Sequence, residues 1–180
     1  SVNNPSCTIL ANDRRREIVR LFAEQSRRLG RRAPVVFDTA YEGLVHDPDV
    51  PAIESGLLHD GLGIACEIGT LSKILAPALR VGYLLASPGP LVDAVVQKTS
   101  DTGFSGPLLT QEIAARLLDH HLAEQLPRCR AVYREKSAAV RAWIDQYLGP
   151  HVEHVTGGRA GFYFYQIGRA SCRERVCHRV

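Results

Sequence analysis

The sequence predicts an α/β protein, because apolar runs of strand length alternate with helical patterns along its first hundred residues. Residues 13–29 have a one-faced helical pattern, and a short apolar run at 35–37 follows it. Two further apolar runs, 64–68 and 81–86, flank a polar connection and are predicted to be buried strands. A long helical region from residue 108 precedes two short strands. That order indicates a second, smaller domain.

The first helix is predicted over 13–29 from an apolar stripe with Arg and Glu between its members: Ile18, Val19, Leu21, Phe22 and Leu29. Gly30 is expected to end this helix, and Asn12 is a candidate N-cap. The run Arg14-Arg15-Arg16 could contact phosphate, but we expect it to be a solvated helix face.

Asp38 directly follows the predicted strand 35–37. Ligands bind at the carboxyl ends of parallel strands in α/β sheets, so Asp38 is a candidate site residue. Residues 42–63 are rich in loop formers, with a short helix expected near 52–58.

Lys73 lies in the connection between the strands predicted at 64–68 and 81–86, among apolar neighbours. Burying an ammonium group costs several kcal/mol unless it is paired or neutralised. A lysine in this position therefore either pairs with a carboxylate or reacts as an amine.

The second half is predicted to be mainly helical. Residues 91–98, 108–123 and 130–148 have helical patterns, and Pro127 is expected to interrupt the long region. Strands are expected at 152–155 and 162–165, joined through Gly157-Gly158. We expect residues 1–107 to belong to one domain and residues 108–166 to a long helical region and part of a second.

Three motifs resemble class I/II aminotransferases, which are pyridoxal phosphate (PLP) proteins of fold type I. They are Ser72-Lys73 with Leu75-Ala76-Pro77 and Leu79-Arg80-Val81-Gly82-Tyr83, then Asp38-Thr39-Ala40-Tyr41, then Asn4-Pro5-Ser6. The branch that they resemble most contains 2-aminoadipate transaminases and MocR-type regulators. Cys7 and Ala78 stand where the family usually has glycine.

This resemblance covers roughly residues 1–166. It implies the later part of the large mixed or parallel-sheet domain and the start of the small C-terminal α+β domain.

The resemblance also implies a role for each matched residue. Lys73 would form a Schiff base with the PLP aldehyde and then move the substrate α-proton as general base and acid. Asp38 would pair with the pyridine nitrogen. Tyr41 and Asn4 would approach the phenolic oxygen of the ring, and Arg80 would bind the phosphate. Thr70 and Ser72 would place hydroxyls near the phosphate and the lysine.

Each role has an ordinary structural alternative. Asp38 could cap a turn, Tyr41 could be a packing residue, and Arg80 could form an ion pair. Thr70 and Ser72 could cap the local backbone. Lys73 without its flanking motifs would more often be a surface lysine.

The resemblance implies an aminotransferase that moves an amino group between an amino acid and a 2-oxo acid, as a homodimer with sites at the subunit interface. The alternative is the effector-sensing domain of a MocR-type transcriptional regulator, which would bind nucleic acid only through an upstream helix-turn-helix. The chain contains no methionine, so we expect a piece of a longer protein that is inactive alone.

Residues 167–180 resemble an in-frame translation of a common short-read sequencing adaptor and are expected to be non-native. They contain four Arg and one Glu, a net charge of +3, which is the net charge of the whole chain. Without them 18 basic and 18 acidic residues remain, so the apparent basicity is no argument for a nucleic-acid or membrane partner.

Cys7, Cys66 and Cys129 are widely spaced and form no C-x-x-C motif, which favours a reducing cytoplasm. His120-His121 lies in a predicted helix, where we expect a pair of surface histidines and not a metal site. No run of about 18 apolar residues is present, so we expect no membrane span.

Overall fold

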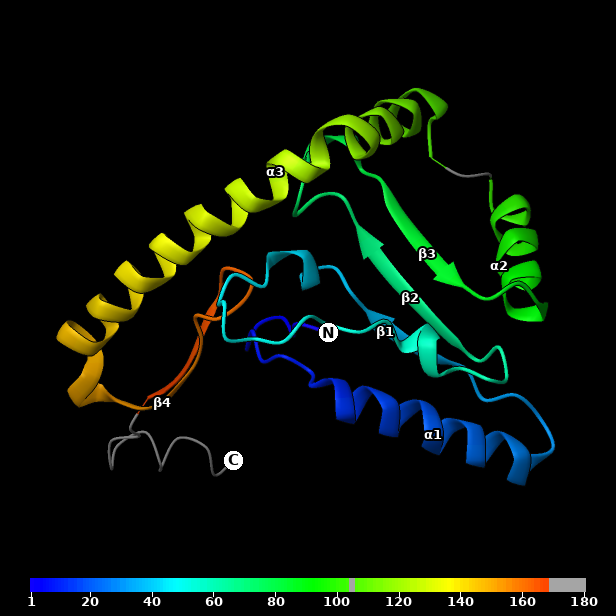
Figure 1. Ribbon diagram of the computed structural model, residues 1–180, viewed down its shortest axis with the longest axis horizontal. Helices are drawn as coiled ribbons and strands as arrows, with labels where there is room; N and C mark the ends of the chain where they lie inside the picture. The colour runs from blue at the N-terminus through cyan, green and yellow to red at the C-terminus, as the bar shows by residue number, and fades with distance from the viewer. Residues whose placement is uncertain (104–105, 169–180) are drawn as a thin grey trace, which may run out of the picture.

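A computed structural model describes residues 1–103 and 106–168. Its first sheet has three strands: β1 (Val35–Asp38), β2 (Ala65–Thr70) and β3 (Gly82–Ala86). β2 lies in the centre, parallel to β1 and antiparallel to β3. Figure 1 shows β1 and β2 between α1 and the long helix α3. The three strands predicted from the sequence are therefore present, with shifts of a few residues at their ends. The predicted burial of the third is wrong, because β3 contains no buried residue.

α1 (Asn12–Leu29) packs on the first sheet through Val19, which is buried with Val35, Phe37 and Ala65. Gly30 ends the helix as predicted. Its φ of 63° is in the left-handed region, and its N–H donates to the carbonyl of Arg27.

Two predictions for α1 are wrong. Asn12 is not its cap, because the side chain donates to the carbonyl of Ala52 and accepts from the N–H of Glu54. The Arg14–Arg16 run is not a fully solvated face either. Arg14 and Arg16 are exposed, but the Arg15 side chain is completely buried beside the carboxylate of Glu42.

α2 (Pro90–Asp101) is followed by α3 (Leu108–Trp143), which continues as a short π-helix at Ile144–Leu148. The predicted interruption at Pro127 is wrong, because α3 runs through it. Proline removes the N–H that would donate to residue 123, but residues 123 and 127 are both exposed, so water can satisfy that carbonyl.

The second sheet is an antiparallel pair, β4 (Val152–Gly157) and β5 (Phe164–Gly168). β5 begins later than predicted, so Phe162 and Tyr163 precede it. A side chain at Gly157 is excluded, since a Cβ there would lie 2.4 Å from the carbonyl oxygen of Tyr163. Ile167 and Gly168, the first two residues of the predicted adaptor stretch, belong to β5, and the rest of that stretch lies outside the described residues.

A buried cluster joins the two sheets. It contains Val2, Cys7, Tyr41, Leu44 and Ala160. The N–H of Gly161 donates to the carbonyl of Leu44 at 3.0 Å, and Val45 forms an isolated bridge with Ala160. The loop between β4 and β5 is thus fixed against the segment that follows β1. The predicted domain boundary near residue 107 stays a prediction.

Within the described part of the chain, no helix is both long and apolar enough to span a membrane.

Candidate functional site

Lys73 lies in the connection between β2 and β3 and is half-buried. Its Nζ is 5.6 Å from the ring centroid of Tyr41 and 5.8 Å from that of Phe162. Both distances are within the range of cation–π attraction. The amine therefore lies at the junction of the first sheet and the β4–β5 loop.

The Lys73 loop is held by its own backbone. Leu71, which is buried, donates its N–H to the carbonyl of Val81 and accepts from the N–H groups of Leu75 and Ala76. The hydroxyl of Thr70 accepts from the N–H of Ser72 and lies 3.1 Å from the Ser72 hydroxyl. These bonds make a closed turn that fixes where the Lys73 side chain starts.

Arg80 lies two residues before the start of β3 and has a φ of 56°, a conformation that a non-glycine residue seldom adopts. It is exposed, and its Nη1 donates to the carbonyl of Pro77 at 3.4 Å. Within the described residues its other donors have no partner. This leaves a planar set of N–H groups near the Lys73 loop that could bind an anion.

Tyr41 is buried at the start of the short helix Glu42–Leu44. The amide of Asn4 donates to its hydroxyl at 3.5 Å. Burial, helped by the hydroxyl of Tyr163, raises the pKa of Tyr41 to about 12. Tyr41 therefore keeps its proton at neutral pH and can donate a hydrogen bond.

Asp38 ends β1, where the register pairs it with Ile68 of β2. Its Oδ1 accepts the N–H of Ala40 at 2.9 Å, so the carboxylate caps the turn that leads to Tyr41. Its Oδ2 has no hydrogen-bond partner among the described residues. The side chain is exposed, and one oxygen remains available to a ligand.

Two aromatic residues at the site were not predicted. Phe162 and Tyr163 were expected to be ordinary strand residues, but their ring centroids lie 5.5 Å and 6.0 Å from that of Tyr41. Gly161 brings them there, with a φ of 63° and so little space that a Cβ would lie 2.8 Å from the sulfur of Cys7. The sequence signal was a glycine before two aromatics, which does not reveal a contact 120 residues away.

The structure brings the amine of Lys73 near the rings of Tyr41 and Phe162, and the amide of Asn4 to the hydroxyl of Tyr41. Asp38 lies three residues before Tyr41. Thr70 and Ser72 lie in the lysine loop, and Arg80 follows it. The amine of a half-buried lysine, a protonated tyrosine hydroxyl, a carboxylate and a guanidinium form a set of donors and acceptors that fits an aldehyde cofactor with a phosphate group.

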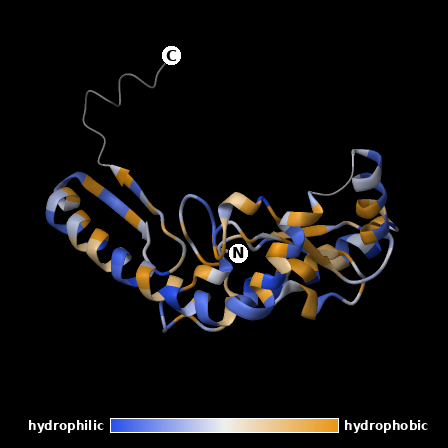
Figure 2. Ribbon diagram, turned by 90° about the horizontal axis from the view of Figure 1, so that it is seen from above, coloured by the Kyte–Doolittle hydropathy of each residue, from blue (hydrophilic) through white to orange (hydrophobic). Residues whose placement is uncertain are grey.

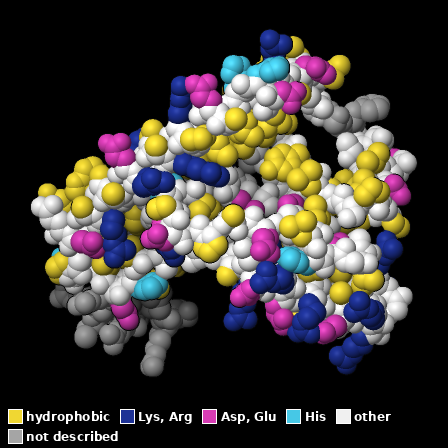
Figure 3. All heavy atoms as spheres, in the orientation of Figure 1, with side chains coloured by type: hydrophobic (Ala, Val, Ile, Leu, Met, Phe, Trp, Pro, Cys, Tyr) yellow, Lys and Arg dark blue, Asp and Glu magenta, His cyan; other side chains and the backbone are white. Residues whose placement is uncertain are grey.

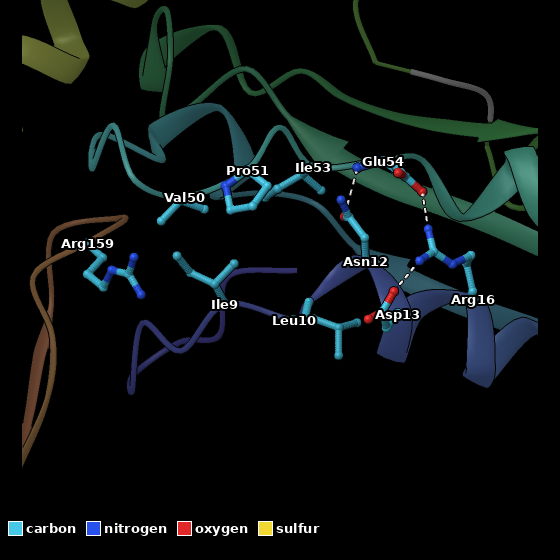
Figure 4. Close-up of a pocket in the computed structure, with 11 residues that line it drawn as sticks. Ile9, Leu10, Asn12, Asp13, Arg16, Val50, Pro51, Ile53, Glu54 and Arg159 are labelled. Atoms are coloured by element: carbon cyan, nitrogen blue, oxygen red, sulfur yellow. Dashed lines mark hydrogen bonds and ion pairs between the residues drawn. The ribbon is translucent and has the colours of Figure 1, made fainter.

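The cavity in Figure 4 lies elsewhere. It has a volume of about 410 Å³ and lies between the start of α1 and residues 50–54, near Arg159. None of the predicted site residues lines it.

Comparison with known proteins identifies the family. The family model for aminotransferase class I and II matches residues 1–178. The match includes residues 167–178, whose adaptor origin stays a prediction. A 2-aminoadipate transaminase of Thermus thermophilus is 28% identical over 147 residues, covering 81% of this chain and 37% of the relative. The uncharacterised HTH-type transcriptional regulator YisV of Bacillus subtilis is 30% identical over 152 residues, covering 83% of this chain and 29% of that protein.

The structural comparisons agree. The crystal structure of LysN, an alpha-aminoadipate aminotransferase from Thermus thermophilus complexed with N-(5'-phosphopyridoxyl)-L-leucine, superposes with a TM-score of 0.79 at 26% identity. The alignment covers 94% of this chain and 42% of LysN. The kynurenine aminotransferase of Pyrococcus horikoshii gives a TM-score of 0.76 at 25% identity, covering 89% of this chain and 38% of that protein.

The chain thus spans about a third of the length of the curated relatives that it matches. The predicted fold class, α/β and part of PLP fold type I, is confirmed by these likenesses. On the match over residues 1–178, the chain belongs to the aminotransferase class I and II family.

Proposed function

We propose that the protein from which this chain comes is a PLP-dependent aminotransferase, which moves an amino group between an amino acid and a 2-oxo acid. The single observation that carries the proposal is the position of Lys73, a half-buried residue whose Nζ lies close to the rings of Tyr41 and Phe162. A homodimer and a cytoplasmic location remain expectations from the family resemblance.

Lys73 would hold the cofactor covalently and, when released by substrate, accept and return the α-proton at Nζ. The bound cofactor would supply an electron sink for the substrate carbanion. The loop around Leu71 keeps the backbone of Lys73 fixed, so only the side chain needs to move between these tasks. The ring of Phe162 lies 5.8 Å from the amine and would attract its protonated form by a cation–π contact.

The other residues would orient the cofactor. The protonated hydroxyl of Tyr41, fixed by Asn4, would donate to the phenolic oxygen of the ring. Asp38 would offer its second carboxylate oxygen to the pyridinium N–H while the first keeps the turn closed. Arg80 would bind the phosphate with its remaining donors, and the hydroxyls of Thr70 and Ser72 lie at the start of the same loop.

A second candidate is the effector-sensing domain of a regulator. Several relatives support it, among them HTH-type transcriptional regulators of Bacillus subtilis, Staphylococcus aureus and Escherichia coli. A winged-helix segment upstream of residue 1 in the full gene product would favour the regulator, and its absence would favour the enzyme.

The direct test is a single-turnover assay on the full-length protein loaded with PLP. We expect 2-oxo acid to form in one equivalent per site when a panel of amino acids is supplied. Lys73→Ala should slow this step at least about a hundredfold, the scale of a lost general base. Lys136→Ala is the matched control, since the Nζ of Lys136 also lies over a ring, that of Tyr133 at 5.9 Å, and should react normally.

If the protein binds PLP but forms no 2-oxo acid from any amino acid of the panel, the proposed enzyme activity is rejected and the regulator is favoured.

A further inference from the structure

Arg15 is a buried cation, and two of the residues that it contacts are sequence neighbours of proposed cofactor residues. Its side chain is 0% exposed, although it belongs to a run of three arginines on a surface helix. Its Nη2 is 2.6 Å from Oε1 of Glu42, and its guanidinium carbon lies 5.3 Å from the ring centroid of Phe37. A third contact, from Nη1 to Oε1 of Glu67, is longer at 4.0 Å.

Two of these contacts bracket one short stretch of chain. Phe37 precedes Asp38, and Glu42 follows Tyr41. A single guanidinium on α1 therefore touches the residue on each side of Asp38-Thr39-Ala40-Tyr41. Arg15 is contributed by a different element from the stretch that it contacts, so it can fix that stretch relative to the sheet.

The energetic balance argues against stability as the main role of Arg15. Burying an ion pair costs about as much as its attraction returns, and apolar replacements of whole buried pairs are often neutral or stabilising. Within the described residues, Nε and Nη1 of Arg15 have no hydrogen-bond partner. The free-energy cost of removing this guanidinium from water is therefore only partly offset. A planar guanidinium, however, fixes direction as well as distance.

We propose that Arg15 is a positioning residue that holds Asp38 and Tyr41 in place for the cofactor. The effect of Arg15 on cofactor binding rests on the proposed function. The ordering of residues 38–45 by Arg15 does not, because it can be measured on the protein without cofactor. Tyr41 needs such support, since its hydroxyl must stay near Asn4 while its ring stays near Lys73.

Arg16 is the matched control. It is the next residue on α1 and also forms ion pairs, with Glu54 at 3.0 Å and with Asp13. Its side chain is 45% exposed, and neither partner adjoins the Asp38–Tyr41 stretch. Replacing Arg16 removes a similar charge from the same helix without touching that stretch.

The first test is amide hydrogen exchange on the full-length protein without cofactor. The N–H groups of Glu42, Leu44 and Val45 bond to the carbonyls of Thr39, Tyr41 and Glu42 and report on the segment directly. We expect Arg15→Met to speed their exchange about tenfold or more, with Val35 and Leu75 as unaffected reporters. Arg16→Met should leave all five amides unchanged.

The double variant Arg15→Met/Glu42→Gln separates positioning from charge balance. It neutralises the carboxylate that loses its guanidinium partner in Arg15→Met, so the melting temperature should recover. If Arg15 positions the segment, exchange at Leu44 and Val45 stays fast despite this recovery. If both properties recover together, or if Arg15→Met and Arg16→Met behave alike, the positioning role is wrong.

The second test measures cofactor affinity. Arg15→Met should weaken PLP binding about tenfold and shift the absorption maximum of the bound cofactor, whereas Arg15→Lys should recover part of both. A wild-type protein that binds no PLP would reject the proposed function, and the exchange result would still decide the role of Arg15. Normal affinity and spectrum in Arg15→Met would reject the positioning role.

Discussion

The surroundings of Lys73 and the stretch from β3 to the middle of α3 are built differently. Around the lysine, Tyr41, Leu44, Leu71 and Ala160 are all buried. β3 and α2 contain no buried residue, and Ala114 is the one buried residue of α3 among those described. Figure 3 shows hydrophobic side chains at the surface over β3, α2 and the first half of α3.

This second region has large exposed apolar residues, which together we call the β3–α3 face: Tyr83, Leu85, Val95, Val96, Leu108, Leu109, Ile113 and Leu118. Figure 2 shows hydrophobic residues on the helices of the same region. Large contiguous apolar surfaces on soluble proteins mark places that another surface covers. Because the chain spans about a third of its relatives' length, we expect the remainder of a family-length chain to cover this face.

The largest effect expected from this difference concerns the 180-residue chain on its own. We expect it to bind a hydrophobic dye strongly, to unfold without a sharp transition and to form no 2-oxo acid, because the β3–α3 face stays uncovered. Thermal unfolding followed by circular dichroism, with the full-length protein as control, measures this. A sharp transition in the isolated monomer would show that the chain folds cooperatively without further residues packed on the β3–α3 face.

Truncating one leucine in each region of the full-length protein sharpens the comparison. Leu44 is 0% exposed, so Leu44→Ala should lower the free energy of unfolding by about 2–5 kcal/mol. Leu109 is 72% exposed in this chain. If the rest of the protein covers it, Leu109→Ala should still cost more than about 1 kcal/mol, above the usual effect of a surface change.

Leu58→Ala is the control, since Leu58 is 74% exposed and lies outside the β3–α3 face. Urea unfolding of the three variants compares them. A Leu109→Ala protein as stable as Leu58→Ala would contradict the proposed cover.

A smaller effect tests the burial of Tyr41. Its pKa is raised to about 12, so the folded protein keeps a proton that the unfolded chain loses near pH 10. The stabilising contribution is therefore complete below pH 10 and is lost as the pH rises toward 12, at up to about 1.4 kcal/mol per pH unit.

Urea unfolding of the wild type and of Tyr41→Phe between pH 9 and 12 isolates this contribution, because the variant lacks the hydroxyl. The stability difference between them should change across that window. A constant difference would show that Tyr41 titrates normally.

The local part of the site could be predicted from the sequence. Lys73 lies between two strands as expected, because a short apolar run on each side of a polar loop is typical of two strands joined by that loop. Asp38 ends its strand and Gly30 ends its helix for similarly local reasons. These features depend on residues that are neighbours in sequence.

Contacts between distant residues were not predictable. Arg15 is buried beside Glu42 and Glu67, which are distant from it in the sequence. The arginine run alone indicates a solvated face, so the sequence does not reveal these partners. Phe162 reaches Lys73 only because the loop after β4 is fixed to Leu44. Pro127 was expected to break α3, but its exposed position lets the helix continue.

The most direct measurement is borohydride reduction of the full-length protein with PLP, followed by peptide mapping. If Lys73 holds the cofactor aldehyde, the yellow colour is lost and one phosphopyridoxyl group is found on the peptide containing Lys73, and none is found in Lys73→Ala. A label on another lysine, or no label at all, would contradict the account.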